Sequence, residues 1–179
     1  MRIGTLGNGL MADALAGQWV KAGHDVMIGG RSADRAAELA HRIGAVPGSL
    51  QEATTYGEIL LLAVPAEVAV QTVAALDLPP GRILIDCSNA LNHKDFTLDQ
   101  PAVAEAIARA APQARVVKAF NLAADSVWRN PPAGLGVPIC ADDPQALAEV
   151  GRLIRDLGCE PVPAGGLRRA RLLEQRLRW

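Results

Sequence analysis

Short runs of apolar residues alternate along the chain with longer segments in which apolar residues recur at the spacing of a helix. A run that is apolar at nearly every position is typical of a strand buried on both faces of a parallel sheet. We expect such strands at residues 1–6, 25–28, 44–46, 58–64, 82–87, 114–120, 137–141 and 159–162. We expect helices at residues 11–22, 32–42, 49–56, 67–76, 101–111, 145–157 and 169–178. This order predicts an α/β fold with a mostly parallel sheet covered on both faces.

The alternation loosens after about Asn121, and the stretch 126–135 is rich in proline and glycine. A chain of 179 residues is long enough for one domain with a small addition. We therefore divide it into a main domain, residues 1–125, and a C-terminal α/β extension, residues 126–179, packed on the same sheet. The polar stretch 92–100 is expected to be a loop.

Composition narrows the classes of partner. Half of the residues are hydrophobic but only 3% are aromatic, so the core must be built from aliphatic side chains. The formal net charge of −1 gives no reason to expect nucleic acid. No apolar run approaches the ~20 residues of a membrane helix, and the chain opens on a strand rather than a signal peptide. Three cysteines without a C-x-x-C pair favour a reduced, cytoplasmic protein, and the three histidines are too scattered to predict a metal site.

The first strand runs directly into the segment Gly7-Asn8-Gly9-Leu10-Met11-Ala12. This is the pattern G-x-G-x-x-A between a strand and a helix. The first glycine allows a tight turn, the second lets the backbone approach a pyrophosphate, and the small third residue lets the helix pack against the strand. The free N–H groups of the helix N-terminus complete a site for phosphate. The sequence therefore predicts a Rossmann-type, doubly wound fold that binds a dinucleotide.

The end of the second strand indicates which dinucleotide. A site for NAD usually carries an acidic residue there, which holds the ribose hydroxyls. This chain has Gly29-Gly30-Arg31-Ser32 instead, with Arg35 one helical turn further on. Arginine makes paired, charge-assisted hydrogen bonds to phosphate, so these residues favour the 2′-phosphate of NADP(H). The alternative is that both arginines belong to an ordinary solvated face.

Ligands of open parallel sheets bind beyond the carboxyl ends of the strands. We expect five strand ends to line one crevice, and these are Gly7–Met11, Gly30–Ser32, Ala63–Pro65, Ser88–Asn89 and Ala119–Asn121.

Other residues that could carry chemistry have simpler explanations. Cys87 ends a buried strand and is expected to be a small packed thiol, and Trp19 is expected to be packing. Lys118 lies inside a strand, so we expect it to face solvent or a helix rather than a substrate. The arginines near the C-terminus fit a solvated helix face, although they could hold an anionic substrate tail or a second subunit. We therefore name no catalytic acid or base.

Several segments together resemble one family. They are RIGTLGNGLMADALA, KAGHDVMIGGRS, LLLAVP, VVKAFN, VPICADDPQA and LGCEPVPAGGLRRARLLE, in that order. They are similar to the NADPH-dependent reductases of coenzyme F-420, a deazaflavin, and to the related reductase domain of STEAP-type metalloreductases. The resemblance implies a Rossmann domain with a small C-terminal lobe, a homodimer, and direct hydride transfer between NADP(H) and the deazaflavin.

The resemblance also implies roles for matching positions. Asn8, Gly9, Leu10 and Met11 would hold the pyrophosphate, and Arg31, Ser32 and Arg35 would hold the 2′-phosphate. Val64, Pro65 and Val68 would border the cofactor, while Asn89, Ala119 and Asn121 would lie near the nicotinamide. The chain departs from the family at Cys87-Ser88-Asn89-Ala90, where relatives commonly have Ala-Thr-Asn-Pro, and it ends early, at Trp179. These departures concern the acceptor rather than NADP(H).

Direct hydride transfer between two stacked rings needs orientation and exclusion of water but no general base from the protein, which agrees with the lack of one here. We therefore expect an NADP-dependent oxidoreductase acting on a small-molecule redox acceptor, either coenzyme F-420 or a flavin. An NADPH-dependent flavin or ferric reductase and a non-catalytic NADP-binding redox sensor remain alternatives. An imine or proline-biosynthetic reductase fits less well, because those enzymes usually carry a further helical domain.

Overall fold

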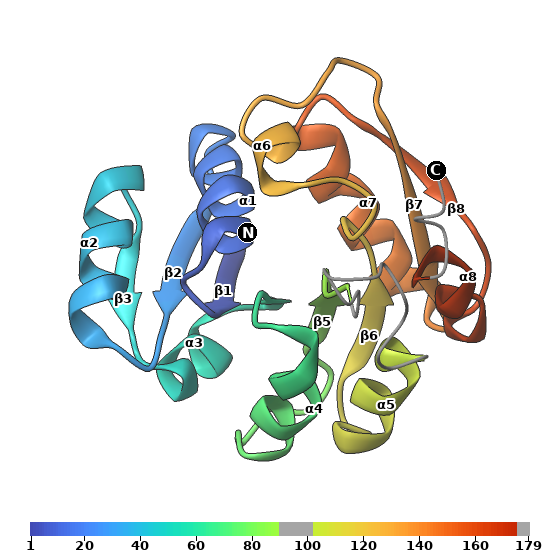
Figure 1. Ribbon diagram of the computed structural model, residues 1–179, viewed down its shortest axis with the longest axis horizontal. Helices are drawn as coiled ribbons and strands as arrows, with labels where there is room; N and C mark the ends of the chain where they lie inside the picture. Colours follow the sequence, from blue (N-terminus) through green and yellow to red (C-terminus); the bar gives the residue numbers. More distant parts are fainter. Residues whose placement is uncertain (90–101, 175–179) are drawn as a thin grey trace.

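The computed structural model describes residues 1–89 and 102–174, which form one eight-stranded sheet with helices on both faces (Figure 1). The expected loop at 92–100 and the last part of the expected terminal helix lie outside the described residues. The strands are β1 (Arg2–Leu6), β2 (Asp25–Gly29), β3 (Val46–Gly48), β4 (Ile59–Leu62), β5 (Ile83–Asp86), β6 (Arg115–Lys118), β7 (Gly136–Ala141) and β8 (Glu160–Pro163). The helices are α1 (Leu10–Lys21), α2 (Ala33–Ile43), α3 (Leu50–Tyr56), α4 (Ala66–Ala74), α5 (Val103–Ala110), α6 (Asp125–Trp128), α7 (Pro144–Asp156) and α8 (Ala170–Glu174), with a 3₁₀ turn at Leu167–Arg169.

The strand order is β3-β2-β1-β4-β5-β6-β7-β8. Neighbouring strands are parallel from β3 to β6, β7 is antiparallel to β6, and β8 is parallel to β7. The chain first moves outward from β1 through β2 to β3, and then returns to the other side of β1 with β4. This reversal is the switch point at which doubly wound sheets bind ligands. The expected α/β, mostly parallel architecture is confirmed.

One local expectation was wrong, and one short helix was not predicted. The third strand begins at Val46 rather than Gly44, because Gly44 instead closes α2 in the left-handed conformation, with φ of 79°. Glycine adopts that conformation without a steric penalty, so it ends a helix rather than starting a strand. The stretch after Asn121 also contains a short helix, α6, which the proline and glycine content concealed.

Two apolar clusters, one on each face of the sheet, form the core. Helices α1, α2 and α7 cover one cluster, and α3, α4, α5 and α8 cover the other. Aromatic packing is confined to the first cluster among the described residues, where Phe120 makes edge-to-face contacts with both Trp19 and Trp128. Trp19 is fully buried, which confirms that it is a packing residue.

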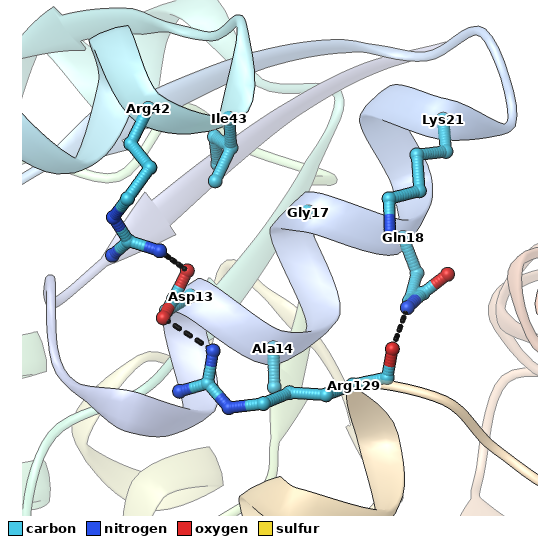
Figure 2. Close-up of a pocket in the computed structure, with 8 residues that line it drawn as sticks. All are labelled: Asp13, Ala14, Gly17, Gln18, Lys21, Arg42, Ile43 and Arg129. Atoms are coloured by element: carbon cyan, nitrogen blue, oxygen red, sulfur yellow. Dashed lines mark hydrogen bonds and ion pairs between the residues drawn. The ribbon is translucent and has the colours of Figure 1, made fainter.

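Two ion pairs that share Asp13 connect the C-terminal extension to the start of the fold. The Asp13 carboxylate, in the first turn of α1, accepts hydrogen bonds from Arg42 of α2 at 2.9 Å and from Arg129, just after α6, at 2.6 Å (Figure 2). The side chain of Asp13 is only 10% exposed, whereas both arginines are about half exposed. Burial raises the pKa of Asp13, but the hydrogen bonds from the two arginines outweigh burial and lower the pKa below its ordinary value. Asp13 thus fastens three helices together beside the glycine-rich turn.

Within residues 1–89 and 102–174, no helix has the length and apolar character needed to cross a membrane.

Candidate functional site

The turn after β1 requires glycine at its first position. Gly7 has φ of +128°, and a Cβ atom built there would lie 2.2 Å from the Ala63 carbonyl oxygen at the end of β4. The Gly7 N–H donates to the Gly29 carbonyl of β2 at 2.9 Å, and the Thr5 hydroxyl donates to the Gly7 carbonyl, also at 2.9 Å. The turn is therefore held between β1, β2 and β4, at the switch point of the sheet.

The N-terminus of α1 is open at this turn. Gly9 is the N-cap residue and supplies no side chain to the N–H groups of the first turn, and a Cβ built on it would meet nothing within 4 Å. The side-chain amide nitrogen of the neighbouring Asn8 is buried and has no hydrogen-bond partner among the described residues. It lies against Gly30, since a Cβ atom built on Gly30 would be 2.6 Å from it. Unsatisfied donors at a helix N-terminus suit an anion such as a pyrophosphate.

A groove of about 420 Å³ starts at this turn and extends over the ends of β2 and β4 toward α3 and α4. Ten predicted site residues line it, namely Gly7, Asn8, Gly9, Arg31, Ser32, Arg35, Ala63, Val64, Pro65 and Val68. Five further residues line it that sequence reasoning missed, namely Leu50, Gln71, Thr72, Ala75 and Leu76. These come from α3 and from α4 and its end. They give the groove a largely apolar wall, with two polar side chains that could bind the edge of a base.

One end of the groove carries unneutralised positive charge. Arg31 and Arg35 are both exposed, and neither takes part in an ion pair among the described residues. Ser32 is the N-cap of α2, and its hydroxyl accepts from the Arg35 N–H at 3.4 Å. A cation beside a helix N-terminus is unfavourable by a few tenths of a kcal/mol or more unless an anion is bound there. The arrangement therefore suits a phosphate group.

The other five predicted residues lie outside this groove. Leu10 is 65% exposed at the start of α1, Met11 is half-buried beside it, and Ala119 is fully buried. Asn89 donates its side-chain N–H to the Asn121 carbonyl at 3.4 Å, so the ends of β5 and β6 are brought together. The amide oxygens of both asparagines are buried, and neither has a hydrogen-bond partner in the part of the chain that the structure describes. Whether any of these residues contacts a cofactor stays a prediction.

The backbone between Ala119 and Asn121 is strained. Phe120 has φ of 65°, in the left-handed region that residues other than glycine rarely adopt. The indole N–H of Trp128 donates to the carbonyls of Phe120 and Ala123, both at 3.1 Å, and so holds this conformation. The strain costs about 1–3 kcal/mol, and it lies one residue before the Asn121 carbonyl that accepts from Asn89.

A cluster of charged side chains lies beneath these strand ends. Lys118 is fully buried, so of the two expected environments, solvent or a helix, the structure shows the helix. Its ammonium group meets Glu174 of helix α8 at 3.2 Å, and also Asp86 of β5 at 2.9 Å. It also donates to the Ser88 carbonyl at 2.7 Å. Burial lowers the pKa of Lys118, but the charges of Asp86 and Glu174 outweigh burial and raise it, so the amine is protonated. Glu174 also accepts the Ala104 N–H at 3.2 Å, in the first turn of α5.

Cys87 is confirmed as a small packed thiol. It is 6% exposed, and its Sγ donates to the Leu62 carbonyl at 3.3 Å. Burial raises the pKa of Cys87 to about 12, and the neighbouring charge of Asp86 raises it in the same direction. The thiolate is the reactive form, so this cysteine is no nucleophile.

Fold and groove together define a doubly wound, dinucleotide-binding protein. Residues 2–90 match the family described as NADP oxidoreductase, coenzyme F420-dependent. This N-terminal part of the chain is therefore a domain of that family.

Comparison with individual proteins agrees with this family match. The chain is 33% identical over 175 residues to the rat protein Metalloreductase STEAP3; the match covers 97% of this chain but 36% of that protein. The chain thus spans about a third of the length of this relative. A crystal structure from Arthrobacter sp. FB24, assigned as an F420-dependent NADP-reductase, superposes with a TM-score of 0.82 at 23% identity, over 96% of this chain and 88% of that one. A reductive aminase from Aspergillus terreus, solved with NADPH, gives a TM-score of 0.75 at 20% identity, over 97% of this chain and 58% of that one. The last two likenesses establish the fold alone.

Proposed function

We propose that this chain binds NADP(H) along the groove and transfers hydride between it and coenzyme F-420 or a flavin-like acceptor. The observation that carries the cofactor assignment is the unpaired Arg31 at the N-terminus of α2, where an NAD site would have an acidic residue. Family membership and the NADPH complex of the structural neighbour support the same assignment.

The residues present fit the dinucleotide. The orphaned Asn8 amide and the uncapped N–H groups of α1 would donate to the pyrophosphate, and Gly9 leaves room for it. Arg31, Arg35 and the Ser32 hydroxyl would hold the 2′-phosphate. Adenine would lie against the apolar wall between α3 and α4, with Gln71 and Thr72 available to its polar edge. NADP(H) bound there would supply the hydride.

The reaction class depends on whether the site offers a side chain that can give or take a proton. Among the described residues, the charged groups beneath the ends of β5 and β6 are Lys118, Asp86 and Glu174. They are buried, and Lys118 pairs with both carboxylates, so they offer no proton at the surface of the site. Hydride transfer to a flavin-like ring needs none, whereas reduction of an alcohol or imine substrate needs a positioned acid or base. We therefore favour a ring acceptor over an imine.

Two alternatives each have support. The name of the rat relative, a metalloreductase, favours an NADPH-dependent flavin or ferric reductase. A non-catalytic redox sensor would keep the groove but transfer hydride to no acceptor. The cysteines are all free and buried, in keeping with the cytoplasmic location that we propose, and a homodimer stays a prediction for sedimentation analysis to test.

The decisive assay follows NADPH oxidation with coenzyme F-420, with free flavin and with ferric iron in parallel, and with NADH in place of NADPH. Saturable turnover of the deazaflavin with NADPH supports the main proposal, and turnover of flavin or ferric iron alone favours the first alternative. NADPH binding without turnover of any acceptor would move the assignment to the sensor.

A substitution tests the cofactor assignment separately. Arg31→Ala removes charge-assisted hydrogen bonds at an exposed position, and we expect NADPH to bind about tenfold more weakly while NADH binding is unchanged. Arg152→Ala is the matched control, because Arg152 is an exposed arginine on α7 that pairs with Glu149. An unchanged NADPH/NADH affinity ratio in Arg31→Ala contradicts the assignment of the 2′-phosphate to this residue.

A further inference from the structure

The cluster beneath the ends of β5 and β6 contains more buried negative than positive charge. Lys118 and Asp86 have no exposed surface, and Glu174 is 1% exposed. Two carboxylates and one ammonium sum to a formal charge of −1. The second carboxylate oxygen of Glu174 is buried and has no hydrogen-bond partner within residues 1–89 and 102–174, so no donor of these residues neutralises the excess negative charge at close range.

A contribution to the stability of the fold does not readily explain such a cluster. Moving ions into a protein interior costs several kcal/mol each, and replacing a buried ion pair with packed apolar side chains is often neutral or stabilising. An uneven cluster is less favourable still, because one charge lacks its counterpart. A role at the neighbouring site accounts for its presence better than a purely structural one.

The cluster is bonded to the residues expected near the nicotinamide. Lys118 donates to the carbonyl of Ser88, the residue before Asn89, at 2.7 Å. On the other side, Asn121 donates its side-chain N–H to the carbonyl of Leu173, the residue before Glu174, at 3.1 Å. The short helix α8 thereby brings a buried carboxylate to the hydride end of the candidate site.

Hydride transfer changes the charge at that end. It moves two electrons and one proton from the neutral reduced nicotinamide to the acceptor, and leaves one positive charge on the ring. A nearby buried negative charge favours the positive ring, because Coulomb interactions are stronger inside a protein than in water.

We infer that the net negative charge of the Lys118–Asp86–Glu174 cluster selects the oxidised over the reduced form of the bound cofactor and so favours hydride donation by NADPH. The inference rests on the proposed function. It assigns Glu174 and Lys118 opposite effects on one measurable ratio, the dissociation constant of NADP⁺ divided by that of NADPH.

Two substitutions test the sign. Glu174→Gln removes one negative charge and keeps the shape and an acceptor for the Ala104 N–H, so the ratio rises by about threefold to tenfold. Lys118→Met removes the positive charge at similar length, so the ratio falls. Asp156→Asn is the control; its carboxylate pairs with His24 near the start of β1, and the ratio stays at the value of the unaltered protein.

Both dissociation constants are measured by calorimetric titration at one pH and ionic strength, with circular dichroism to verify folding. A purely structural role shifts both constants together or moves the two variants in the same direction, and either result overturns the inference. So does an unchanged ratio in a folded Glu174→Gln protein. Each variant alone tests the direction in which the ratio of the two dissociation constants changes. If one variant fails to fold, the other still decides the inference. Failure of the unaltered protein to bind NADPH would instead refute the proposed function, and the inference with it.

Discussion

Replacing Asp13 by asparagine removes the negative charge that fastens α1, α2 and α6 while keeping the size of the side chain. The carboxylate accepts from Arg42 on one oxygen and from Arg129 on the other (Figure 2). Asparagine can accept from only one of them, and its amide nitrogen would face the second guanidinium group, donor against donor. We expect the folded protein to lose both ionic interactions and one hydrogen bond.

The size of the loss follows from exposure. A hydrogen bond to a charged group contributes about 1.5–3 kcal/mol when both partners are shielded. Here Asp13 is 10% exposed, but Arg42 and Arg129 are 56% and 41% exposed, so solvent screening reduces each contribution to about 1 kcal/mol. The free energy of unfolding should fall by about 1–2 kcal/mol, which lowers the Tm of a protein of this size by about 3–6 °C.

Urea and thermal unfolding at several pH values provide the assay. The pKa of Asp13 is lowered in the folded protein from its ordinary 3.8, so its stabilisation is complete above about pH 5 and is lost as the pH falls through the folded pKa. The difference between the unaltered protein and Asp13→Asn should therefore be full at pH 7 and shrink below about pH 4. Glu67→Gln, an exposed acid in the first turn of α4, controls for the helix dipole. A difference that is independent of pH, or no greater than that of the control, refutes the ionic explanation.

Three further predictions concern the turn, the thiol and the strained backbone. Gly7→Ala should abolish NADPH binding in binding titrations, because the new Cβ would lie 2.2 Å from a backbone oxygen and force the turn open. Cys87 should stay unmodified by thiol reagents in the native protein at pH 8, since its pKa is raised to about 12, and should react only after denaturation, as mass spectrometry would detect. Trp128→Phe should lower the free energy of unfolding by about 1–2 kcal/mol, measured by urea titration, because it leaves the buried Phe120 carbonyl and the partly buried Ala123 carbonyl without their donor.

The parts of the site that could be predicted from sequence are those that the local chain builds. The turn at Gly7 and the Arg31–Ser32 helix start depend on residues adjacent in sequence, so their pattern carries the geometry. Gly44 shows the limit of the same reasoning, since one glycine can end a helix or begin a strand, and only the packing of α2 decides which.

Features assembled from distant segments could not be predicted in this way. Gln71 and Thr72 line the groove because α3 and α4 both border it, and no local pattern marks them. Lys118 is buried because Asp86, 32 residues earlier, and Glu174, at the far end of the chain, meet it. An isolated lysine in a strand gives no sign of such partners.

Both edge strands of the sheet, β3 and β8, contain proline. In the outermost strand β8, the N–H groups of Glu160 and of Ala164, just beyond the strand, point inward to the chain of β7, at 2.9 and 2.8 Å, so the alternate positions, Pro161 and Pro163, face outward. Proline has no N–H group to offer a further strand. At the opposite margin Pro47 occupies the middle of the three-residue strand β3. A second copy of the chain cannot readily extend this sheet into a continuous one, so the protein is protected from the edge-to-edge stacking that leads to aggregation.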